Sequence, residues 1–108
     1  MFTHYLTYSF ALNFQRDCFL LTEATHPHSQ SLMSSADRMV AELGRAMEAP
    51  RPQERAKALL VSVLCLRDCK EVLDRTGGLP PTMKGPYEIL HGRLERLCSE
   101  AHDAVRCV

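Results

Sequence analysis

Four side chains that could bind a metal ion recur at helical spacing in the second half of the chain. Cys65 and Cys69 are four residues apart, and so are Cys98 and His102. Residues at positions i and i+4 lie on one face of an α-helix, so two antiparallel helices could present three thiolates and one imidazole to a shared site. Such a ligand set suits zinc, or copper(I) if fewer ligands engage. A metal-binding helical bundle is therefore one hypothesis for this chain.

The same cysteines have a simpler interpretation as core residues. Cys65 and Cys69 lie in the most apolar segment of the chain, where a free cysteine behaves as a small hydrophobic residue. Structural zinc sites also use C-x2-C turns more often than a C-x3-C spacing on a helix. We therefore expect core cysteines and no cofactor, with zinc or copper as the alternative.

No combination of residues in the sequence predicts an enzyme. A nucleophilic cysteine needs a lowered pKa, and the cysteines at 65 and 69 are expected in mid-helix, away from a helix N-terminus. The Thr76-Gly77-Gly78 segment lacks the lysine of a phosphate-binding loop and follows a predicted helix instead of a strand. The carboxylates are scattered over polar faces, where nothing raises their pKa for acid–base catalysis. We expect a protein without catalytic activity.

The segment that carries the first cysteine pair has clear helix start and stop signals. Pro52 suits the first position of a helix, because its missing N–H has no intrahelical acceptor there. Gly77 and Gly78 can adopt the left-handed conformation that ends a helix, and the two prolines that follow oppose its continuation. These signals predict a buried helix over about residues 52–76.

Two further helices are predicted on either side of this one. A one-sided apolar stripe predicts a helix over about residues 35–48, with Ser34 and Asp37 as its capping pair. After a proline-rich loop, Pro86 opens a second apolar stripe, which predicts a helix over about residues 86–107.

The first 32 residues differ in composition from the rest of the chain. They contain six of the seven aromatic residues but only three charged ones. Apolar residues alternate with small polar ones over residues 2–14, which is typical of a half-buried strand, although a helix also fits. We therefore predict an all-α protein: an aromatic N-terminal arm and connector over residues 1–32, either strand or extra helix, and a small bundle of three to four helices over 33–108. A natural start at Met33 would make the first 32 residues an accessory arm.

The aromatic arm is the main indication of function. A lone strand needs a partner for its backbone groups, and exposed apolar surface marks a binding site. We expect a non-catalytic protein–protein interaction module (an adaptor, chaperone or regulatory subunit) that binds a second copy of itself or joins a larger complex. The residues expected to bind the partner are Phe2, Leu6, Tyr8, Phe10, Leu12 and Phe14.

Composition argues against other kinds of partner. The 13 basic and 13 acidic residues cancel and are scattered, so the chain lacks the basic stripe of a nucleic-acid-binding protein. The longest apolar run is far shorter than the roughly 20 residues that span a bilayer. The N-terminus does not resemble a signal peptide, and five cysteines cannot all pair within one chain. We expect a cytoplasmic protein that binds neither nucleic acid nor membrane.

Overall fold

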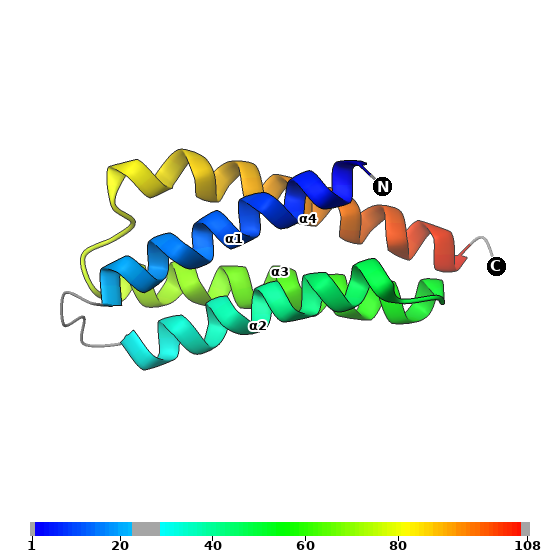
Figure 1. Cartoon of the computed structure of the whole chain (residues 1–108), viewed down its shortest axis with the longest axis horizontal. Helices are drawn as coiled ribbons and strands as arrows, with labels where there is room; N and C mark the ends of the chain where they lie inside the picture. The colour runs from blue at the N-terminus through cyan, green and yellow to red at the C-terminus, as the bar shows by residue number, and fades with distance from the viewer. Residues whose placement is uncertain (1, 23–28, 107–108) are drawn as a thin grey trace.

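The computed structural model describes residues 2–22 and 29–106. Within these ranges the chain forms four α-helices and no strand, so the all-α class predicted from the sequence is confirmed. The helices are α1 (Phe2–Thr22), α2 (Ser29–Glu48), α3 (Pro52–Arg75) and α4 (Pro81–Arg106). Figure 1 shows them side by side along the long axis of a molecule that measures 47 × 22 × 19 Å.

Successive helices run in opposite directions and pack against one another. α1 also packs against α4, so each described helix has two neighbours and one diagonal counterpart. The start of α1 and the end of α4 therefore lie at the same end of the bundle (Figure 1). Short connections between antiparallel neighbours are typical of an up-down-up-down four-helix bundle.

Two glycines end α3 and turn the chain toward α4. Gly77 and Gly78 have φ values of 115° and 91°, a region that strains residues with a Cβ atom. The N–H of Gly78 donates a hydrogen bond to the carbonyl of Leu73 at 2.8 Å, which satisfies one of the unpaired carbonyls at the helix end.

α2 and α4 begin earlier than the sequence pattern predicts. α2 already includes Ser34 and Asp37, so the predicted capping pair is wrong. Asp37 instead accepts a hydrogen bond from Nε2 of Gln15 in α1, at 2.8 Å. α4 already includes Pro86, which was predicted to open it. Because Pro86 lies in the second turn, it removes a single intrahelical hydrogen bond there, and the helix continues through it.

The N-terminal segment is one of the four helices of the bundle. The strand alternative for residues 2–14 is wrong, and the structure shows no separate aromatic arm. Ala11, Phe14 and Cys18 lie in the core, and the Phe14 ring is 6.0 Å from the ring of Tyr87 in α4. A helix pairs most of its own backbone groups, so this segment needs no strand partner. Any argument for a second chain must therefore rest on side chains.

Buried polar side chains in the described part of the chain are all paired. Ser62 of α3 donates a hydrogen bond from Oγ to the carbonyl oxygen of Met39 in α2, at 2.9 Å. No buried side-chain nitrogen or oxygen among the described residues lacks a partner. The polar groups in the described interior of the bundle are thus satisfied, which leaves the surface as the place for a binding site.

Candidate functional site

The outer face of α1 exposes large apolar side chains. Tyr5, Leu12 and Phe19 recur every seven residues and are 65%, 42% and 50% exposed, and Leu20 beside them is 56% exposed. Positions seven apart are separated by about two helical turns, so these side chains share one side of the helix. We refer to Tyr5, Leu12, Phe19 and Leu20 as the α1 stripe.

The surface around the α1 stripe carries almost no charge. Residues 2–22 contain only Arg16 and Asp17 as charged residues, and only Arg16 is exposed. Four of the seven exposed large apolar side chains in the described part of the chain belong to α1, and none belongs to α2. The outward face of a bundle helix is normally polar, so α1 departs from the usual pattern. None of the described helices is both long enough and apolar enough to cross a membrane.

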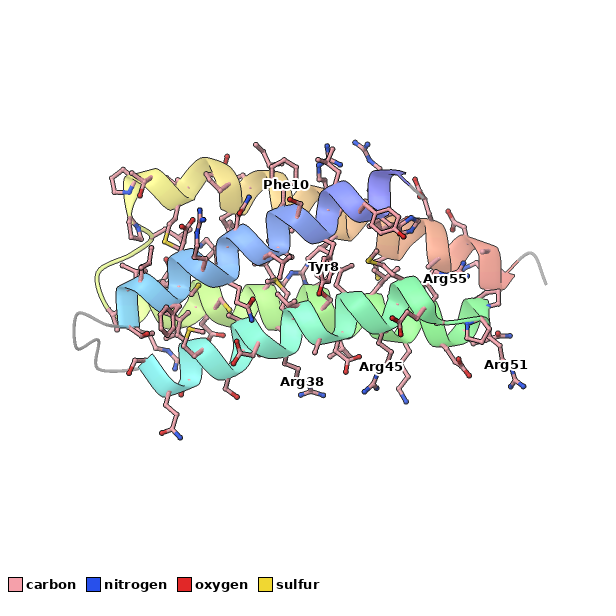
Figure 2. All side chains as sticks on the ribbon, viewed as in Figure 1. Tyr8, Phe10, Arg38, Arg45, Arg51 and Arg55 are labelled. Carbon is pink, nitrogen blue, oxygen red and sulfur yellow. The ribbon has the colours of Figure 1, made fainter. Side chains whose placement is uncertain are left out.

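A hollow of about 660 Å³ opens beside the stripe, at its Tyr5 end. Gly44 of α2 faces the Tyr8 ring there, and a Cβ atom at this position would lie 3.7 Å from that ring, an ordinary van der Waals contact. Figure 2 shows Tyr8 directed from α1 toward α2. The lining residues are His4, Tyr5 and Tyr8 of α1, Gly44, Ala46, Met47 and Glu48 of α2, and Arg55 of α3.

The hollow is lined by aromatic rings, by the imidazole of His4 and by the guanidinium of Arg55. Burial lowers the pKa of His4, and nearby positive charge, with Arg55 a smaller part of it, acts in the same direction, so this imidazole is neutral at pH 7. The Arg55 guanidinium donates a hydrogen bond from Nη2 to the carbonyl oxygen of Ala49 at 3.3 Å, which holds the cation at this end of the bundle. The hollow can therefore accept an apolar ring beside a fixed cation.

One of the six residues expected to bind a partner lies on the α1 stripe. That residue is Leu12; Phe14 is only 1% exposed and packs in the core. The half-buried members of the set are Leu6, Tyr8 and Phe10. The side chain of Phe2 lies outside the described residues.

The helical geometry of α1 explains why the even-numbered residues do not share one face. The Phe10 ring faces α4, where Cζ of Arg93 lies 5.1 Å from its centroid, whereas Tyr8 faces Gly44 of α2. Residues two apart point in nearly opposite directions on a helix, while in a strand they share a face. Sequence reasoning therefore missed Tyr5 and Phe19. Their seven-residue spacing from Leu12 was the available signal.

The four predicted metal ligands do not come together in the structure. Cys69 forms a hydrogen bond with the Cys18 thiol of α1, and its Sγ lies 3.8 Å from a carbonyl oxygen of α2. Cys65 is buried, and Cys98 contacts His102 within α4, with 3.5 Å between Sγ and Nδ1. Throughout residues 2–22 and 29–106, no three His, Cys, Asp or Glu side chains form a group that could hold a metal ion.

The environment of these cysteines keeps their thiols protonated. Burial raises the pKa of Cys65 and of Cys98, and the hydrogen bond with Cys18 together with burial raises that of Cys69. Zinc and electrophiles both react with the thiolate form, which a raised pKa disfavours. Nδ1 of His102 donates a hydrogen bond to the Cys98 carbonyl oxygen at 2.8 Å, so this nitrogen is not free to accept the thiol proton. The arrangement favours packing over chemistry.

Comparisons with protein-family models, with curated proteins and with solved structures give no match. The α1 stripe and the hollow beside it are therefore the features from which a function must be argued.

Proposed function

We propose that this protein is a non-catalytic protein–protein interaction module that binds its partner through the α1 stripe, as an adaptor, a chaperone or a regulatory subunit does. The observation that carries the proposal is that, among the residues the structure describes, four of the seven exposed large apolar side chains gather on one helix. The inner face of this helix already packs in the core, so the outer side chains are left over from folding. Covering them with a partner surface would gain roughly 25 cal/mol per Å² of apolar area.

The bundle holds α1 in a fixed position, which supports its use as a docking surface. Phe14 packs against Tyr87 of α4 on one side, and Gln15 bonds to Asp37 of α2 on the other. A surface that is ordered before binding loses less conformational entropy when the partner arrives. Aromatic side chains such as Tyr5 and Phe19 commonly dominate the binding energy of such interfaces.

Site-specific photo-crosslinking in the cells that make the protein tests this proposal. A benzoylphenylalanine at position 12 would sit in the middle of the α1 stripe. The matched control is position 60, because Leu60 of α3 is 43% exposed and Leu12 is 42% exposed. We expect a discrete crosslinked protein from position 12 and none from position 60. No product from position 12, or equal products from both positions, would overturn the proposal.

A further inference from the structure

We infer that the partner which covers the α1 stripe is a second copy of this chain, with the two α1 helices antiparallel about a two-fold axis at Leu12. This inference rests on the proposed function and adds the identity of the partner and its geometry. Along the stripe an aromatic residue, a leucine and an aromatic residue follow one another at steps of seven residues, about 10.5 Å each. A two-fold axis at Leu12 therefore places Tyr5 of each copy opposite Phe19 of the other.

The charge on this surface is compatible with the antiparallel orientation. Arg16 is exposed and lies on the same side of α1 as Ser9, with which it flanks Leu12. In a parallel pair the two-fold axis runs along the helices and places the two Arg16 side chains on opposite flanks of the interface, so they would not meet. In the antiparallel pair each Arg16 lies beside Ser9 of the other copy, and the two cations are about 12 Å apart along the helix axis.

The hollow gives Phe19 a place to dock. It opens at the Tyr5 end of the stripe, and the antiparallel arrangement brings Phe19 of the second copy to that end. Its volume of about 660 Å³ exceeds the roughly 150 Å³ that encloses a benzene ring. Tyr8 and Met47 supply apolar walls, and Arg55 supplies a cation for the face of the incoming ring. By symmetry each copy offers one such ring and one such hollow.

The area of the stripe is compatible with a dimer of modest stability. From their exposed fractions, the four side chains contribute roughly 400 Å² of apolar surface per copy, with aromatic side chains taken as about 200 Å² each. Two copies and their polar rim together approach the roughly 1,000 Å² at which specific interfaces begin. We therefore expect dissociation in the micromolar range, on the order of 10 μM.

Sedimentation equilibrium of the full chain between about 1 and about 300 μM tests the inference. We expect a monomer–dimer equilibrium that Leu12→Arg weakens by at least about tenfold, because it places two cations at the two-fold axis. Leu60→Arg is the matched control and should leave the equilibrium unchanged. A monomer at every concentration would overturn the inference, as would a dimer that responds to Leu60→Arg but not to Leu12→Arg.

A charge placed at Ser9 distinguishes the two orientations. In the antiparallel dimer Ser9→Glu pairs with Arg16 of the other copy and should tighten the dimer about two- to fivefold, whereas Ser9→Arg should weaken it. In a parallel dimer the two copies of position 9 lie on opposite flanks of the interface, away from Arg16, so both substitutions would leave association nearly unchanged. Little effect of either substitution, or weakening by both, would therefore refute the antiparallel geometry.

Sedimentation and crosslinking together distinguish self-association from binding to a different protein. If the chain is a monomer in solution but position 12 crosslinks to a different protein in cells, self-association fails and the interaction module stands. If the chain is a monomer and position 12 gives no crosslink, both fail.

Discussion

At the scale of single residues, the cysteines show how packing sets reactivity. Cys18 and Cys69 are fully buried on diagonal helices and share a hydrogen bond, and Cys65 is only 5% exposed. Cys98 is partly exposed at the edge of the core, and burial raises its pKa. A thiol without a lowered pKa and without access to solvent is inert, so the three buried cysteines belong with the apolar side chains of the bundle.

Thiol labelling of a Cys107→Ser variant tests this arrangement. We expect one thiol, Cys98, to react with a disulfide reagent in the folded protein, and the other three to react only after unfolding. Because the pKa of Cys98 is raised, less thiolate is present at neutral pH than in a free cysteine. Its labelling rate should therefore be lower than that of a model thiol at pH 7 and still rise above pH 9. Rapid labelling at pH 7, or labelling of several thiols at once, would contradict the structure.

At the scale of helices, α1 has two apolar faces that do different things. Phe14→Ala should lower the free energy of unfolding by about 3 to 5 kcal/mol, because it leaves a cavity in the core. Phe19→Ala removes a ring of the same size from the exposed face and should change the stability of the monomer by less than about 0.5 kcal/mol. Urea unfolding at low protein concentration measures both. Equal losses would mean that α1 is not oriented as the structure shows.

The two faces of α1 also explain what the sequence could not predict about this helix. The helix over residues 52–75 begins at a proline and is followed by two glycines. Such local signals identify a helix from the sequence alone. In α1 the apolar residues occupy both the buried and the exposed sides, which obscures the helical period and allows an alternating pattern to fit. Only packing against α2 and α4 decides the matter. The sequence predicted that α4 begins at Pro86, but the first turn of the helix lies before this residue.

At the scale of the whole molecule, the rotation of each helix about its own axis determines which side chains of neighbouring helices meet. The i, i+4 spacing correctly places Cys65 with Cys69, and Cys98 with His102, on common helix faces. It does not say which neighbour each face meets, and in the structure Cys69 meets α1 and α2. For the same reason, the sequence alone could not identify the residues of the proposed partner surface. The sequence indicated an apolar N-terminal segment, but the residues of α1 that face outward emerged only once its inner face was known.

Removal of α1 tests whether the bundle needs all four helices. A chain that begins at Ser29 keeps α2 whole, lacks the core contributions of Ala11, Phe14 and Cys18 and uncovers Tyr87 of α4. We expect it to retain helical circular dichroism, lose cooperative thermal unfolding, and bind a hydrophobic dye as loosely packed states do.

The control for this truncation is Leu12→Arg in the full chain, which alters only the outer face of α1 and should keep cooperative unfolding. If the shortened chain instead unfolds cooperatively with undiminished stability, the other three helices form a bundle by themselves. α1 would then be an accessory arm, and the buried side of this helix, including Phe14, would become a second surface available to a partner.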